Sequence, residues 1–120
     1  MMVYGIKNCS TVKKALTWFD SHQIEYDFYD LKKDALDVAT LTVWFKKLPG
    51  HLTWDMLINK SSMTWRNLTD REKKLADNQE AAVQLIIEKP TLMKRPLVAI
   101  DKRLVSLGFD EAVFKQLFKK

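Results

Sequence analysis

Residues 2–28 read MVYGIKNCSTVKKALTWFDSHQIEYDF, and the spacing of their apolar side chains changes twice. Residues 3–6 are β-prone and end at a polar Lys-Asn pair. From residue 12 to residue 19, apolar side chains recur at the i, i+3, i+4 and i+7 spacing of a helix. Residues 24–28 then alternate between apolar and acidic, as in a half-buried strand. This order predicts a parallel, right-handed βαβ unit.

The chain has 120 residues, the length of one domain, which is enough to fold without disulfides or a structural metal. The apolar content of 47% argues against disorder. Three glycines and three prolines exclude collagen-like and low-complexity classes. One cysteine excludes an internal disulfide framework and an all-cysteine zinc site. We therefore expect a single compact domain over residues 1–120.

The net charge of +5 is compatible with contact to nucleic acid or to anionic small molecules, and it proves neither. A solvated basic surface is the commoner explanation. The sequence contains no apolar run near the ~20 residues of a membrane helix. We see no signal peptide at the N-terminus, and a free thiol without an export signal indicates the reducing cytoplasm.

Residues 35–89 are predicted to be a helical insertion, because each helix in them is too short to bury its apolar stripe alone. One stripe runs from Leu41 to Leu48 and stops at a Pro-Gly pair. Thr69 and Glu72 have the spacing of a capping box, and Asp77 with Glu80 forms a looser acidic version. Pro90 ends the helical run.

Strands are predicted again after Pro90. Residues 97–100 are an apolar run, and residues 103–105 follow after a short Asp-Lys connection that predicts an antiparallel hairpin. Asp110 is expected to cap a last helix that ends near Lys119 and Lys120. Its inward side chains are expected to be Val113, Phe114, Leu117 and Phe118. The fold class is thus α/β, with a mixed four-stranded sheet built from a βαβ half and a ββα half.

Cys9 is the strongest candidate for chemistry, because it lies between the first strand and the first helix. Ser10 or Thr11 is expected to cap that helix. Amides of its first turn would then face the sulfur and favour the thiolate, the nucleophilic form. Lys13 adds positive potential, and the same amides suit an oxyanion or a carboxylate. The alternative is a buried cysteine that acts as a small hydrophobic residue.

A partner cysteine is missing from the chain. Val12 stands where a Cys-x-x-Cys motif would place the second thiol. A reactive Cys9 therefore needs an outside thiol, such as glutathione, to resolve its oxidised form.

Arg95 and Pro96 precede the apolar third strand. Proline suits the first position of a strand, and an X-Pro bond is the one that readily becomes cis. A cis turn would leave backbone groups to bind an extended thiol substrate beside Cys9, and Arg95 could pair with an oxyanion. The alternative is an ordinary surface arginine followed by a strand-start proline.

Other candidate residues have both a functional and a structural interpretation. Asn8 is expected to fix the cysteine loop or to tolerate its turn dihedrals. Thr11 and Lys13 are expected to bind substrate or simply to cap and solvate the helix. No metal site is predicted, because His22 and His51 lie far apart and lack ligand spacing.

Residues 4–15, 64–68, 93–97 and 107–109 closely resemble the ArsC-like family, which includes glutaredoxin-coupled arsenate reductases, Spx regulators and YffB-like proteins. The YffB-like branch is the nearest match. The resemblance implies a thioredoxin-like fold with a helical insertion, Cys9 as the nucleophile, and a cis Pro96. It also implies glutathione as co-substrate and glutaredoxin as a candidate partner.

The sequence departs from the arginine triad with which arsenate reductases of this family hold the oxyanion. Arg95 matches one arginine, but the first position falls at Asn59 and the last, after the final strand, near Ser106. Losing two guanidinium groups disfavours arsenate reduction, because charge-assisted bonds dominate such a site. The basic residues that remain as substitutes are Lys60, Arg66 and Arg103.

These observations predict a glutathione-linked monothiol oxidoreductase in which Cys9 attacks, with Arg95 orienting an anion. The alternative is an Spx-like regulatory module that binds RNA polymerase, although that branch typically carries the Cys-x-x-Cys switch that Val12 removes. Direct nucleic-acid binding is not expected, because the four tryptophans have no basic ladder around them.

Overall fold

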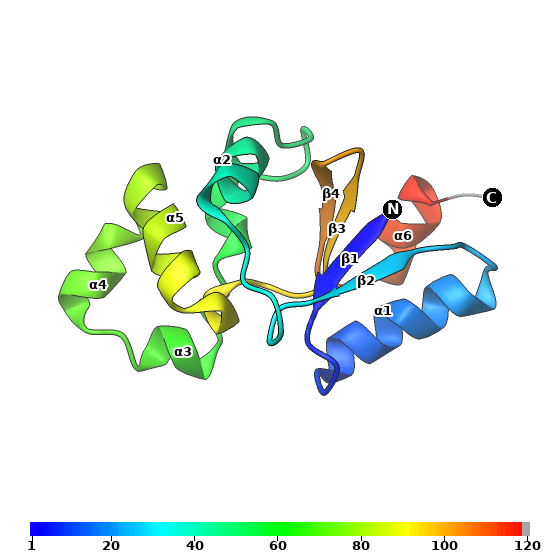
Figure 1. Ribbon diagram of the computed structural model, residues 1–120, viewed down its shortest axis with the longest axis horizontal. Coiled ribbons are helices and arrows are strands. Elements are labelled where there is room, and N and C mark those ends of the chain that lie inside the picture. Colours follow the sequence, from blue (N-terminus) through cyan, green and yellow to red (C-terminus); the bar gives the residue numbers. More distant parts are fainter. Residues whose placement is uncertain (119–120) are drawn as a thin grey trace. The chain divides into compact units, whose positions relative to one another are not determined.

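The computed structural model describes residues 1–118 and contains a four-stranded mixed sheet of strand order β2-β1-β3-β4 (Figure 1). The strands are β1 (Met2–Gly5), β2 (Asp27–Asp30), β3 (Leu97–Ile100) and β4 (Arg103–Leu107). β1 pairs in parallel with β2, whereas β3 is antiparallel to both β1 and β4. The predicted βαβ half and ββα half are therefore confirmed.

The chain divides into two compact units. The first unit contains residues 1–34 and the chain from residue 95 onward, and the second contains residues 35–94. The second unit includes the predicted helical insertion of residues 35–89 and continues to Lys94, whose amide donates to the Leu57 carbonyl at 2.8 Å. That the two units form one domain stays a prediction.

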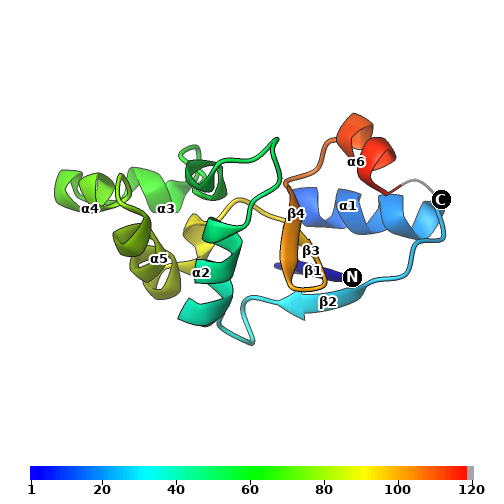
Figure 2. The same ribbon diagram turned by 90° about the horizontal axis from the view of Figure 1, so that it is seen from above.

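The core of the first unit lies between the sheet and two helices, α1 (Ser10–Ser21) and α6 (Glu111–Leu117) (Figure 2). Aromatic rings dominate this core, and the Phe19 ring lies 5.1 Å from Phe114 and 5.2 Å from Phe118. The buried cluster consists of Val3, Ala15, Trp18, Phe19, Val98, Phe114 and Phe118. The predicted apolar face of α1 is thus its packing face on the sheet.

Two expectations for the first unit are corrected. The second strand begins at Asp27 rather than Ile24, because its first pairing partner on β1 is Met2, which lies opposite Asp27. Leu117 is 39% exposed although it was expected to face inward. Phe114 and Phe118 fill the space beneath α6 instead, and Lys119 and Lys120 lie outside the described residues.

The β3–β4 hairpin turns through two residues with positive φ, Asp101 at 51° and Lys102 at 67°. Both central residues of a type I′ turn have this conformation, which matches the twist of the flanking strands. The pairing register shifts between Val98 and Ala99 at a β-bulge. The predicted antiparallel hairpin is confirmed, and its turn forms without a glycine.

The second unit is helical. It contains α2 (Val38–Lys46), the 3-10 helix η1 (Trp54–Leu57), α3 (Met63–Arg66), α4 (Asp70–Leu75), α5 (Gln79–Glu88) and the 3-10 helix η2 (Pro90–Leu92). The capping box is confirmed: Thr69 Oγ1 accepts from the Glu72 amide at 3.1 Å, and Glu72 Oε1 accepts from the Thr69 amide at 3.0 Å. α5 is capped by Asn78 instead of Asp77. Among residues 1–118, no helix is long and apolar enough to cross a membrane.

Candidate active site at the start of α1

Cys9 lies at the carboxyl end of β1 and occupies the N-cap position of α1. Its amide donates to the Ile6 carbonyl at 3.2 Å, and its carbonyl accepts from the Lys13 amide at 3.0 Å. These bonds fix the turn after β1 on one side and the first turn of α1 on the other. The expectation that Ser10 or Thr11 caps this helix is therefore wrong, because the cap position belongs to the cysteine itself.

Gly5 allows α1 to start close to β1. A Cβ atom at this position would lie 2.9 Å from Val12 Cγ2 and 3.5 Å from Phe28 Cε1. A side chain there would push Val12, and with it the first turn of α1, away from the strand. The sequence analysis did not single out this glycine, and the signal for it was a glycine at the end of a strand just before a helix start.

The pKa of the Cys9 thiol is held below its ordinary value. Partial burial by itself would raise this pKa, because it disfavours the charged form. Hydrogen bonding from the Val12 and Thr11 amides, followed by a hydrogen bond and the positive charge from Arg95, outweighs that effect. The thiolate is therefore the form that this site stabilises, as the sequence predicted.

The Cys9 sulfur does not cap α1 in the way that a serine or aspartate oxygen would. Cys9 makes no side-chain cap hydrogen bond of ordinary geometry, although the amides of Thr11 and Val12 lie close enough to favour its anion. A neutral thiol is a weak acceptor, so these amides gain most when the sulfur is ionised. The half-exposed thiol is thus accessible to a substrate and electrostatically prepared for attack.

Three further predicted residues lie on the cysteine loop and the first turn of α1. Thr11 contributes its amide and not a capping hydroxyl. Lys13 is exposed on α1, and the groups that lower the thiol pKa are the two amides and Arg95. Asn8 is exposed in the turn before Cys9, so it lies at the rim of the site.

Arg95 and Pro96 lie beside Cys9, although they are distant in the chain. Leu97, the next residue, pairs with Tyr4 near the end of β1, which brings the Arg-Pro step to the sulfur. The Arg95–Pro96 peptide bond is cis, as predicted. A cis turn was expected to leave backbone groups for substrate, but the Pro96 carbonyl accepts from the Gly108 amide at 2.8 Å and is thus paired within the fold.

The sequence analysis named five positions in connection with the two missing family arginines. Two of them, Ser106 and Arg103, belong to the first unit. Ser106 lies inside β4 and not after it, is 1% exposed, and its hydroxyl has no hydrogen-bond partner among residues 1–118. Arg103 pairs with Ile100 at the hairpin, whereas Cys9 follows the opposite end of β1. Arg103 is therefore excluded as a substitute for a family arginine.

The other three positions, Asn59, Lys60 and Arg66, belong to the second unit. Asn59 donates its amide to the Leu92 carbonyl at 2.9 Å, and its side chain accepts from the Ser61 amide. Lys60 Nζ lies 5.4 Å from the centre of the Trp65 ring, a cation–π distance. Arg66 is the exposed last residue of α3. Arg95 is thus the guanidinium that the first unit supplies to the sulfur.

The two histidines belong to different units of the chain. His22 ends α1, where its Nδ1 lies 2.8 Å from the Trp18 carbonyl oxygen and its ring stacks on Trp18. His51 belongs to the second unit and is exposed. In the part of the chain that the structure describes, no three residues of metal-ligating type come together.

A thioredoxin-like sheet with a stabilised thiolate at the first helix and a cis proline before the third strand defines a thiol-oxidoreductase-like fold. The model of the ArsC family matches residues 4–117, so the chain belongs to the ArsC family. The fold and the family implied by the sequence resemblance are therefore confirmed.

Relatives cover nearly the whole chain. An uncharacterized protein of Haemophilus influenzae is 42% identical, and the match covers 97% of this chain and 96% of that protein. The solved structure titled YFFB superposes with a TM-score of 0.83 at 33% identity, with 96% of each chain covered. Global transcriptional regulator Spx 2 of Bacillus cereus is 26% identical over 100% of this chain and 88% of its own length. The likeness to the YffB-like branch agrees with the sequence analysis.

Proposed function

We propose that this protein is a glutathione-dependent monothiol oxidoreductase with Cys9 as its nucleophile. The observation that carries the proposal is the lowered pKa of a half-exposed thiol between two helix amides and Arg95. A structural cysteine gains nothing from such surroundings, whereas a nucleophile needs them. The cytoplasm, where glutathione is reduced, is the compartment that this chemistry requires.

The reaction has two thiol–disulfide exchanges. The Cys9 thiolate attacks the glutathione sulfur of a mixed disulfide, forms a Cys9–glutathione disulfide, and releases the substrate thiolate, which takes a proton from water. A second glutathione thiolate attacks the glutathione sulfur of this adduct, releasing the Cys9 thiolate and oxidised glutathione. In sum, the mixed disulfide and one free glutathione become the substrate thiol and oxidised glutathione, and Cys9 returns to its thiolate form.

The residues around the sulfur have distinct roles in these steps. The Thr11 and Val12 amides and Arg95 stabilise the Cys9 thiolate, both as attacking group and as leaving group. Arg95 also has the charge to orient a glutathione carboxylate. Asn8 and Lys13 lie at the exposed rim, and Pro96 bounds the site from the β3 side.

Arsenate is a poor substrate candidate for this site. The first unit supplies one guanidinium, that of Arg95, to the sulfur, and the buried hydroxyl of Ser106 carries no charge. An arsenate dianion needs several charge-assisted hydrogen bonds. We therefore propose a disulfide substrate and retain glutaredoxin as an alternative reductant of the Cys9–glutathione adduct.

Turnover tests the proposal more sharply than labelling, because Cys9 is the one thiol of the chain. The substrate is the mixed disulfide of glutathione and 2-mercaptoethanol, reduced by glutathione, with oxidised glutathione measured as product. Wild type should exceed the uncatalysed rate, and Cys9→Ser should not. A Cys9–glutathione adduct that forms but is not released by glutathione would contradict the proposal.

The alternative is a regulatory module that binds RNA polymerase, and the whole-chain match to Global transcriptional regulator Spx 2 favours it. Capture of the C-terminal domain of the polymerase α-subunit tests this directly. Equal capture by wild type and Cys9→Ser, together with no turnover, would support the alternative over the enzyme.

A further inference from the structure

Five exposed lysines gather at the end of the first unit where Cys9 lies. They come from the turn after β1, the start of α1 and the loop after β2, which the sheet brings together. The Leu31 amide donates to the Gly5 carbonyl at 2.9 Å, so the two loops leave the sheet side by side. The five residues, called here the lysine rim, are Lys7, Lys13, Lys14, Lys32 and Lys33.

The lysine rim is only partly neutralised by acidic groups. Asp30 and Asp34 lie in the same loop region, and Asp30 is half-buried with Oδ1 accepting from the Lys32 amide at 2.9 Å. Arg95 adds a further positive charge at the sulfur. This end of the first unit is therefore positive.

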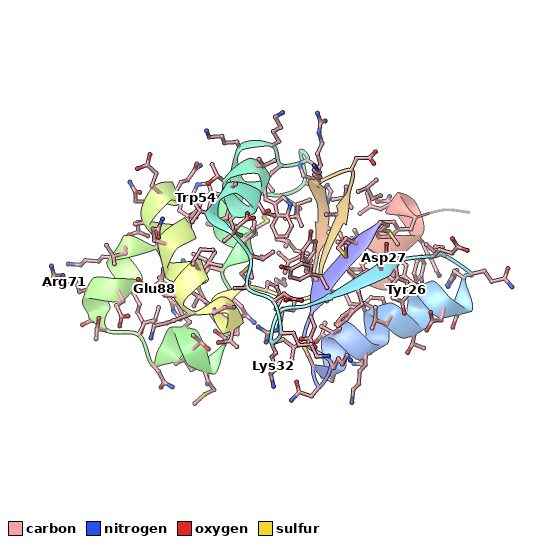
Figure 3. All side chains as sticks on the ribbon, viewed as in Figure 1. Tyr26, Asp27, Lys32, Trp54, Arg71 and Glu88 are labelled. Atoms are coloured by element: carbon pink, nitrogen blue, oxygen red, sulfur yellow. The ribbon has the colours of Figure 1, made fainter. Side chains whose placement is uncertain are left out.

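The opposite end of α1 and β2 is acidic. Asp20 lies in the last turn of α1, and its Oδ1 accepts from the Tyr26 hydroxyl at 3.2 Å. Glu25 and Asp27 flank that tyrosine. Figure 3 shows Tyr26 and Asp27 at one end of β2 and Lys32 beyond the other. Along α1 and β2, the basic residues thus lie at the Cys9 end and the acidic residues at the opposite end.

The direction of this separation opposes helix stability. A helix start carries partial positive charge, so lysines there are unfavourable and acidic residues at the helix end are too. α6 shows the favourable order, with Glu111 in its first turn and Lys115 in its last. Because α1 has the reverse order, its stability does not account for Lys13, Lys14 and Asp20.

We propose that the lysine rim docks an acidic segment of a protein substrate, next to the disulfide that Cys9 attacks. This inference rests on the proposed function. A protein fits better than a nucleic acid, because the rim lies at the same end of the first unit as a thiolate whose electrophile is a disulfide sulfur. Charge complementarity of this kind raises association rates and is screened by salt.

Binding is measured with a fluorescent acidic peptide, Glu-Glu-Ser-Glu-Glu, which cannot react. At low salt, the quadruple variant Lys13→Gln, Lys14→Gln, Lys32→Gln, Lys33→Gln should bind it about tenfold more weakly than wild type. The matched control Lys46→Gln, Lys47→Gln, Lys73→Gln, Lys74→Gln removes four charges from the second unit and should bind as wild type does. Thermal unfolding verifies that both variants fold.

Reaction is measured with glutathionylated peptides, Glu-Glu-Cys-Glu-Glu and Gln-Gln-Cys-Gln-Gln. Wild type should react with the acidic peptide about tenfold faster, and this ratio should approach one in 0.5 M salt and in the rim variant. Equal rates for both peptides, or an equal loss of binding in the control variant, would overturn the docking surface. Tighter binding of a single-stranded oligonucleotide of equal charge would assign the rim to nucleic acid.

The two proposals fail differently. No reaction with either peptide rejects the oxidoreductase, while the binding of the unreactive peptide still decides the lysine rim. Equal reaction rates with the acidic and the neutral peptide would support the oxidoreductase and reject the lysine rim as a docking surface.

Discussion

The N-cap residues of helices α1 and α4 both have extended backbone conformation, but the side chains around the two first turns differ. Thr69 caps α4 with its hydroxyl, and Asp70 and Glu72 add negative charge to the first turn. Lys73 and Lys74 occupy its last turn, as the helix dipole favours. α1 has Cys9 at the corresponding position, no side-chain cap of ordinary geometry and no acidic residue in its first turn.

This difference in capping shows why α1 favours an anion at its start and the other helices do not. Side-chain oxygens cap α2, α3, α5 and α6 as well, from Asp37, Ser62, Asn78 and Asp110. Such a cap satisfies the first amides and stabilises the helix. At α1 the same amides remain available to a sulfur, so the local electrostatics favour its thiolate instead.

The largest test replaces Cys9 by Ser. Turnover of the glutathione mixed disulfide should fall to the uncatalysed rate, because the nucleophile is gone. Stability should move the other way, rising by up to about 1 kcal/mol, because serine is a good N-cap. Urea unfolding at acidic pH, where the thiol is protonated, measures this change, and a loss of more than about 1 kcal/mol would show that the thiol matters for packing instead.

Arg95→Gln should give the next largest effect. Losing a charge-assisted hydrogen bond to the sulfur should raise the thiol pKa and slow alkylation at neutral pH severalfold. Iodoacetamide labelling between pH 5 and 10 measures the inflection. Arg103→Gln, at the other end of the sheet, is the control and should leave the inflection in place.

The lowered pKa also makes stability depend on pH. A group whose pKa is lower in the folded state than in the unfolded state stabilises the fold above the unfolded pKa and loses this contribution as pH falls through the folded pKa. Wild type should therefore gain stability relative to Cys9→Ala as pH rises through this range. Urea unfolding of both proteins at several pH values measures it, and a constant difference would contradict a shifted thiol.

Thr69→Ala changes the N-cap of α4, the helix compared with α1. It removes the hydroxyl that accepts from the Glu72 amide and should cost about 1 kcal/mol. Because this cap belongs to the second unit, iodoacetamide labelling of Cys9 should be unchanged. Slower labelling in this variant would link α4 to the thiol and weaken the contrast with α1.

Ser10→Glu gives α1 the charge order of α4 and should have the smallest effect. An acidic residue in the first turn should stabilise the helix by about 0.5 kcal/mol. The same charge disfavours the thiolate, so labelling at neutral pH should slow by a few-fold. Ser10→Gln controls for size, and equal labelling in the two variants would argue that the helix start does not govern the sulfur.

Local patterns predicted much of this architecture. The period of apolar residues located α1 and the sheet strands, and the Thr69–Glu72 spacing located a capping box. These features depend on neighbours a few residues away, which a sequence displays directly. Asp110 as the cap of α6 succeeded for the same reason.

The predictions that were wrong are those in which tertiary packing outweighed a local preference of the sequence. Ser10 is a better capping residue than Cys9 by propensity, but the turn anchored by the Cys9–Ile6 bond sets the helix start one residue earlier. Leu117 has the spacing of a core residue, but the rings of Phe114 and Phe118 already fill the space under α6.

The sequence by itself determined that there is one thiol, that Val12 removes an internal partner, and that a helix begins beside the sulfur. Only the tertiary structure decided which charge reaches that sulfur. Arg95 does so because β3 pairs with β1, whereas Arg103 is carried to the far end by the same pairing. Backbone hydrogen bonding between distant strands sets these positions, and no spacing along the chain encodes the resulting distances.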